Sequence, residues 1–128
     1  SSVIVLPTIN TSLQLILAGA ITTNQLDFTV SYQQISASGQ TTHTATNGTS
    51  NGGTAVTLVA VPSVAGDRRI VKSIAVHNND TVSATVTIRY NDNGTFRTVF
   101  KVILATLENL VYEDGHGWQA FTTAGGLK

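Results

Sequence analysis

The sequence predicts an all-β protein: an antiparallel β-sandwich or a small jelly-roll-like barrel with an extended N-terminal arm. Apolar residues recur at every second position in several segments, which is typical of half-buried strands. Clusters of Asn, Asp and Gly, which favour tight turns, separate these segments. No window shows the apolar spacing of an amphipathic helix. The 128 residues are enough for one domain that buries its own core.

Residues 1–35 are expected to form the arm and to contain two strands. The first candidate is the apolar run at residues 13–17. The second alternates polar residues with Leu26, Phe28, Val30 and Tyr32. Two strands without a disulfide are marginal on their own, and the chain has no Cys. The arm must therefore pack on another surface, either its own C-terminal sheet or a neighbouring subunit.

Residues 36–54 are predicted to be a polar linker or a long exposed loop. This segment contains only Ser, Ala, Gly, Gln, Thr, Asn and His43. Nothing in it is larger and more apolar than Ala, so it offers a core little to bury.

Residues 55–128 are predicted to form the sandwich itself. Its clearest strand alternates polar residues with Val82, Ala84, Val86, Ile88 and Tyr90. Further strands are expected at residues 55–61, 70–77, 96–104, 109–112 and 118–121. The turn residues at 78–80, 91–94 and 113–115 predict hairpins between successive strands. Residues 70–121 would then form an antiparallel meander.

The charges argue against two classes of partner. Seven basic and seven acidic residues give a net charge of +0, so no long-range field attracts nucleic acid or an anionic membrane. Neither partner is expected. Asp27 is the only charged residue among the first 66. Because a surface this poor in charge does little to prevent association, we expect neighbouring subunits to cover the arm.

The residues predict no catalytic, cofactor or metal site, and we expect the protein not to be an enzyme. The absence of Cys excludes thiolate chemistry, and the sequence contains no known catalytic motif. Three histidines, His43, His77 and His116, have no spacing that would bind a metal together with a carboxylate. Structural roles are favoured for all three.

Two local clusters have both a structural and a functional interpretation. The turn at residues 113–117 precedes Trp118, the only Trp. We favour a hairpin whose Trp caps the core or a subunit interface; the alternative is a carbohydrate-binding module in which Trp118 and Tyr112 stack on sugars. The basic cluster of Arg68, Arg69 and Lys72 is interpreted as a solvated strand entrance, because a nucleic-acid site would need more positive charge and nearby aromatic residues.

Several strings together resemble a widespread class of small structural proteins of tailed bacteriophages. In the C-terminal part these are VKSI (71–74), HNNDT (77–81), ATVTI (84–88), YNDNG (90–94) and LVYEDGHGW (110–118). Near the N-terminus, LQLILAGA (13–20) and TTNQL (22–26) are similar to the opening of the same class. The resemblance leaves the polar segment at 36–54 unmatched and supplies no catalytic residue.

The resemblance implies a virion protein, and we expect a capsid decoration (cement) protein. Such a protein binds the lattice of the major capsid protein on the outer capsid surface and stabilises the head, after synthesis in the cytoplasm of the bacterial host. A tail, baseplate or fibre component is the alternative. The expected partners are the major capsid protein and further copies of the chain, as a trimer or another small cyclic homo-oligomer. The candidate interface residues are Val3, Ile4, Val5, Leu6, Leu13, Leu15, Leu17 and Trp118.

Overall fold

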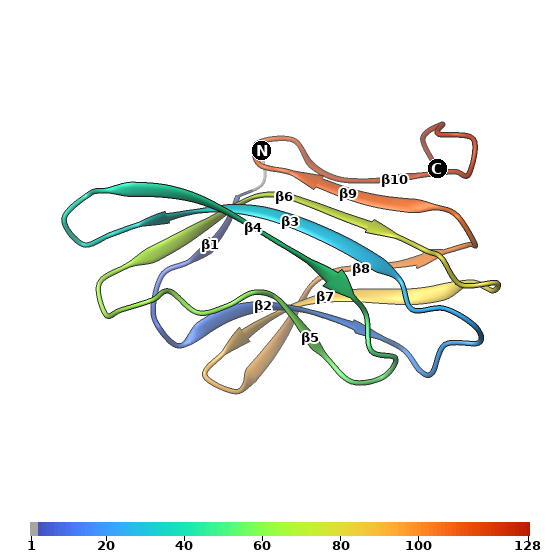
Figure 1. Ribbon diagram of the computed structural model, residues 1–128, viewed down its shortest axis with the longest axis horizontal. Helices are drawn as coiled ribbons and strands as arrows, with labels where there is room; N and C mark the ends of the chain where they lie inside the picture. Colours follow the sequence, from blue (N-terminus) through green and yellow to red (C-terminus); the bar gives the residue numbers. More distant parts are fainter. Residues whose placement is uncertain (1–2) are drawn as a thin grey trace.

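The computed structural model describes residues 3–128 as two antiparallel sheets packed face to face (Figure 1). This confirms the predicted all-β class and its sandwich form. The first sheet runs in the order β10 (Gly117–Phe121), β9 (Asn109–Glu113), β6 (Arg68–His77), β3 (Asp27–Ile35) and β4 (Thr41–Thr49), and β1 (Ile4–Leu6) also pairs with β6. The second sheet runs in the order β5 (Val56–Val59), β2 (Thr11–Leu17), β7 (Ala84–Asp92) and β8 (Thr95–Leu104). No helix that could cross a membrane occurs within residues 3–128.

The core lies between the two sheets and follows the alternation seen in the sequence. In β3, every second residue points inward, so that Phe28, Val30 and Tyr32 are buried. In β7, Val86 and Ile88 are buried on the facing sheet. Because every strand of this core has a polar outer face, the fold needs no helix to cover it.

The N-terminal strands are part of this core, which answers the question of where the arm packs. β2 lies between β5 and β7, and β3 lies between β6 and β4. β1 pairs with the start of β6. Residues 1–35 therefore do not form an arm that reaches away from the sandwich; in the part that the structure describes, they supply strands to both of its sheets.

The prediction of a linker or loop at residues 36–54 is wrong for residues 41–49, which form β4. This strand pairs with β3 along its whole length, from Asp27 opposite Thr49 to Ile35 opposite Thr41. Backbone pairing needs no large side chain, and Thr favours strands because its branched Cβ fits the pleated backbone. Gly48 fixes the register, because an added Cβ at this position would lie 3.1 Å from Cζ of the buried Phe28 ring.

The predicted meander is also wrong, because two of its connections cross between the sheets. β7–β8 and β9–β10 are hairpins, as the turn residues at 91–94 and 113–115 predict. The residues that follow β6, however, lead from the first sheet to β7 in the second. Residues 105–108 lead back from β8 to β9. The cluster at 78–80 is therefore a crossing between sheets rather than a hairpin turn.

Candidate functional site

The densest cluster of buried polar groups lies at this crossing and is centred on Asn78. Its side chain is fully buried and makes three hydrogen bonds. The amide nitrogen donates to the carbonyl oxygens of Val82, at 3.1 Å, and Leu104, at 2.8 Å, and the amide oxygen accepts the N–H of Asp80 at 2.8 Å. Asn78 thus satisfies backbone groups that the crossing places inside the protein, where an unpaired polar group would be costly.

The backbone of Asn78 joins this crossing to the one that leads back. Its N–H donates to the carbonyl of Glu108 at 3.0 Å, and its carbonyl accepts the N–H of Leu107 at 2.7 Å. The Glu108 carboxylate accepts the Ala105 N–H at 2.8 Å and the Lys128 ammonium at 2.5 Å. The hydrogen bond from Lys128, helped by that from Ala105, lowers the pKa of Glu108 against the opposing effect of burial.

Asp80 holds the connection between β2 and β3 to the same cluster. Its buried carboxylate accepts the N–H groups of Thr22, Thr23 and Asn24 at 2.9, 2.8 and 3.2 Å, and that of Thr81 at 2.9 Å. The Thr22 hydrogen bond is the largest cause that lowers the pKa of Asp80 to about 2; the other three act in the same direction, and burial opposes them. The carboxylate stays ionised because four backbone N–H groups point at it.

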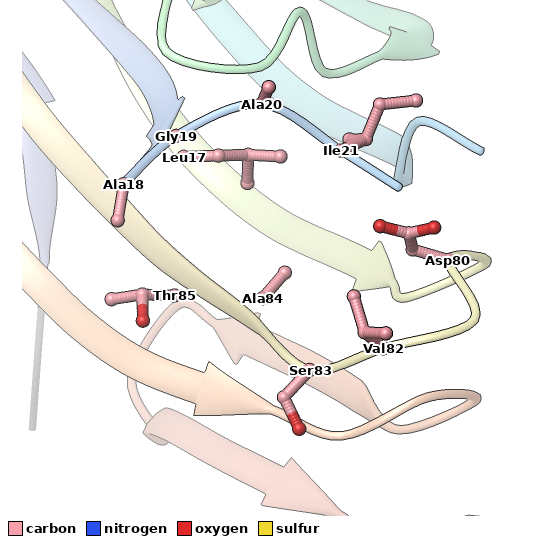
Figure 2. A pocket seen from close by; sticks show the side chains of 10 residues that line it. All are labelled: Leu17, Ala18, Gly19, Ala20, Ile21, Asp80, Val82, Ser83, Ala84 and Thr85. Atoms are coloured by element: carbon pink, nitrogen blue, oxygen red, sulfur yellow. The ribbon is translucent and has the colours of Figure 1, made fainter. Parts of the chain in front are cut away.

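A small cavity lies beside Asp80, between the β2–β3 connection and the start of β7 (Figure 2). Its volume is about 180 Å³, below the roughly 300 Å³ at which small-molecule sites begin. The side chains around it are Leu17, Ala18, Ala20, Ile21, Asp80, Val82, Ser83, Ala84 and Thr85, together with Gly19. Asp80 is the one ionisable residue in this lining, and its oxygens already accept four hydrogen bonds. The cavity therefore offers hydrogen bonding but no free general base.

A wider depression lies on the outer face of the first sheet, at the ends of β3 and β4. It measures about 380 Å³ and is lined by Asp27, Phe28, Thr29, Asn47, Gly48 and Thr49. The Asp27 carboxylate accepts a hydrogen bond from the Asn79 side-chain amide. With one carboxylate and no neighbouring acid, base or nucleophile in its lining, this depression has no arrangement that would carry out catalysis.

The three histidines lie on separate elements. His43 is exposed on β4, His116 is exposed in the β9–β10 turn, and Nδ1 of His77 lies 2.7 Å from Oδ1 of Asn109. Within residues 3–128, no group of three His, Cys, Asp or Glu side chains could hold a metal ion.

Trp118 closes the sandwich where the edge strands β10 and β8 meet. Its ring stacks on Phe100 of the second sheet, with centroids 4.9 Å apart and an angle of 8° between the planes. Tyr112 of the first sheet packs against the same ring at 4.9 Å and 47°. Burial raises the pKa of Tyr112. These internal contacts favour a Trp that caps the core over a platform that stacks on sugars.

The basic cluster is largely engaged within the chain. The Arg69 guanidinium donates to Gln34 Oε1 and to the Ala60 carbonyl, each at 2.9 Å, and lies 4.9 Å from the centroid of the Tyr32 ring. Lys72 pairs with Asp114 at 2.7 Å. Arg68 is exposed at the start of β6, as expected for a strand entrance.

The structure leaves few of the candidate interface residues available to a neighbour. Five of the eight are buried in their own sandwich: Ile4, Leu6, Leu13, Leu15 and Leu17. Val5 and Trp118 are half-buried, and Val3 is 59% exposed. The apolar side chains of the N-terminal strands therefore stabilise the fold of a single chain, and a contact between subunits needs another surface.

The most open surface is β4, which the sequence analysis missed. Its side chains are exposed except at Thr46 and Gly48, which are half-buried. It carries no charged residue and no Pro. The available signal was its five Thr residues among nine, a strand-favouring composition that the surrounding Gly, Ser and Asn residues obscured.

Comparisons with protein-family models, with curated proteins and with solved structures find no match to this chain. Its function is therefore argued from its own residues.

Proposed function

We propose that this chain is a structural protein of a bacteriophage virion, most specifically a capsid decoration protein. It binds the lattice formed by the major capsid protein on the outer surface of the head and stabilises that lattice. The observation that carries the proposal is β4, a nine-residue uncharged strand at the open edge of a sandwich. Such an edge presents unpaired N–H and C=O groups and is suited to assembly with other protein chains.

The use of the polar side chains supports a structural rather than a catalytic role. The buried ionisable and amide groups, such as Asp80, Glu108 and Asn78, bind backbone groups and join connections of the fold. The resemblance of strings such as YNDNG (90–94) to phage structural proteins points in the same direction. The proposal accordingly includes no cofactor and no catalytic residue.

The proposed mechanism relies on many weak contacts. The outer face of the first sheet presents small neutral side chains, among them Thr29, Ser31, Ser73 and Ala75. Such a face can lie flat on another protein without burying an unpaired charge. Each copy then needs only a modest interface, because a symmetric lattice engages many copies at once.

The test is the location and number of copies in purified virions. Quantitative mass spectrometry is expected to find hundreds of copies per particle, and electron cryo-microscopy is expected to place them on the head. Particles that lack the chain should lose their genome at a lower temperature than complete particles. A handful of copies confined to the tail would contradict the proposal and favour a tail, baseplate or fibre component.

A further inference from the structure

The exposed edges of this sandwich differ in how well they are protected against pairing. Strand edges commonly carry charges, bulges, a Pro or a covering segment that prevents contact with other chains. β1 has three residues and is followed by Pro7, and β5 has four residues. β8 carries Arg97 and Lys101, and its register with β7 is interrupted by a bulge.

The outer edge of β10 is covered by the C-terminal segment. Phe121 forms an isolated bridge with Leu127, and the Lys128 N–H donates to the Ala120 carbonyl at 2.8 Å. β4 has none of these features. Its nine residues contain no charge and no Pro, and they pair with β3 without a register shift. Figure 1 shows the β3–β4 hairpin extending at one end of the sandwich.

Two hydrogen bonds that flank the β3–β4 ladder show which residues of β4 face outward. The Ser36 N–H donates to the Gln40 carbonyl, and the Ser50 N–H donates to the Leu26 carbonyl, each at 2.8 Å. Hydrogen-bonded pairs alternate along an antiparallel ladder, so residues 42, 44, 46 and 48 bond to β3. The N–H and C=O groups that point away from the sheet are those of Thr41, His43, Ala45, Asn47 and Thr49.

We propose that this edge pairs with the same edge of a second copy, antiparallel, about a two-fold axis at Ala45. In this register Ala45 faces the partner's Ala45, His43 faces the partner's Asn47, and Thr41 faces the partner's Thr49. All five outward-facing residues then exchange backbone hydrogen bonds with their counterparts. The first sheet becomes one continuous sheet through both copies.

The side chains of the outward-facing residues favour a second copy as the occupant. Their order is symmetric about the centre: Thr at both ends, a polar residue at positions 43 and 47, and the small Ala45 in the middle. A two-fold contact brings each patch against itself, so a charge of one sign near the axis would meet its own copy and repel it. β4 carries no such charge, whereas the cations of β8 would oppose self-pairing of that edge.

The inference deepens the proposed function by naming the surface through which copies join, but its test needs no virion. Sedimentation velocity of the purified full chain over a range of concentrations is expected to show a monomer–dimer equilibrium. The double variant His43→Lys/Asn47→Lys places Lys opposite Lys at two positions, and we expect roughly tenfold weaker dimerisation. The matched variant His43→Lys/Asn47→Asp places Lys opposite Asp and should dimerise at least as well as the wild type.

A cysteine cross-link tests the position of the two-fold axis. The chain has no Cys, so Ala45→Cys introduces a single thiol that faces its own copy across the axis. Mild oxidation should convert it to a disulfide-linked dimer, because the Cα separation of a hydrogen-bonded antiparallel pair, about 5.5 Å, suits a disulfide. The control, Thr98→Cys on the exposed β8 strand, should remain monomeric.

Three results would overturn the inference. They are a wild-type monomer at every concentration, equal dimerisation of the two double variants, and equal cross-linking of the two cysteine variants. A chain that dimerises as expected but is missing from virions would overturn the proposed function and leave the pairing of β4 intact.

Discussion

The crossing at residues 78–80 and the edge strand β4 have similar compositions and opposite surroundings. Both are rich in Asn, Thr and other neutral polar residues, with Asp80 as the one charged residue between them. At the crossing, Asn78 and Asp80 are buried, and their side chains hold three connections of the fold together. Along β4, most side chains are exposed and alternate backbone groups face solvent.

The difference teaches that topology, rather than composition, decides what a polar segment does here. A chain that crosses between sheets carries its backbone groups past the buried ends of other strands, so it needs polar partners inside the protein. An edge strand can leave its outer groups to water or to another chain. We therefore expect substitutions at the crossing to change stability, and substitutions on β4 to change association.

The largest expected effect is that of Asn78→Ala. The substitution leaves the carbonyls of Val82 and Leu104 and the N–H of Asp80 without their partner inside the protein. Each unsatisfied buried group costs roughly 1–3 kcal/mol, so we expect a loss of about 3–5 kcal/mol in the free energy of unfolding. Denaturant titration followed by circular dichroism measures this loss.

The control for Asn78→Ala is Asn47→Ala on β4, the same substitution at an exposed site. We expect the free energy of unfolding of the monomer to change by no more than about 0.5 kcal/mol. Similar losses in the two variants would contradict the contrast between the crossing and the edge.

The second effect is that of Asp80→Ala, and it depends on pH. The pKa of Asp80 is about 2 in the folded protein and close to 3.9 in an unfolded chain. The folded state thus binds fewer protons, and the stability that the carboxylate supplies is complete above about pH 4 and is lost as the pH falls towards 2. At pH 6 we expect Asp80→Ala to lower the thermal midpoint by roughly 5–10 °C. Differential scanning calorimetry should show this difference shrinking between pH 4 and pH 2; a constant difference would contradict the role of the ionised carboxylate.

The third effect is that of Trp118→Ala, which opens the contact between β10 and β8. Trp118 is half-buried and stacks on Phe100, so the loss should fall below that of a fully buried Trp, at about 2 kcal/mol. Trp118→Phe keeps an aromatic ring in place and should recover about half of this loss. Denaturant titration measures both variants, and a loss equal to that of Trp118→Ala would show that the stacking contributes nothing.

The sequence was informative wherever side chains alternate between a core and solvent. The alternation in β3 and β7 predicts strands because a period of two places one set of side chains on the buried face. The hairpins at residues 91–94 and 113–115 follow from residues that tolerate the required backbone angles, including Asn93 at φ 51° and Gly94 at φ 93°. These features are local, so a short window contains all the information needed.

The features that the sequence could not show depend on residues far apart in the chain. Asn78 resembles a turn residue in its own window, and its buried role appears only when Leu104 and Glu108 lie beside it. The β4 strand has no apolar alternation, because its inward-facing positions lie near the rim of the core. The arm was misplaced for the same reason: an apolar run such as residues 13–17 shows that it will be buried but does not show against which chain.

The smallest expected effect marks where the open edge meets the core, at Gly48. On β4 this residue lies over the Phe28 ring, and an added methyl group would be 3.1 Å from Cζ of Phe28. Gly→Ala in a strand gains about 0.4–1 kcal/mol from the unfolded state, whereas overpacking a buried ring costs about 1–3 kcal/mol. Because Phe28 is only 5% exposed and has little room to move, we expect Gly48→Ala to destabilise the protein by about 1 kcal/mol. Gly19→Ala is the matched control: no atom lies within 4 Å of its added Cβ, so thermal melting should show a neutral or stabilising effect. If Gly48→Ala were also neutral, the inward face of β4 would be as free as its outward edge, and the contrast between core and edge would not extend into this strand.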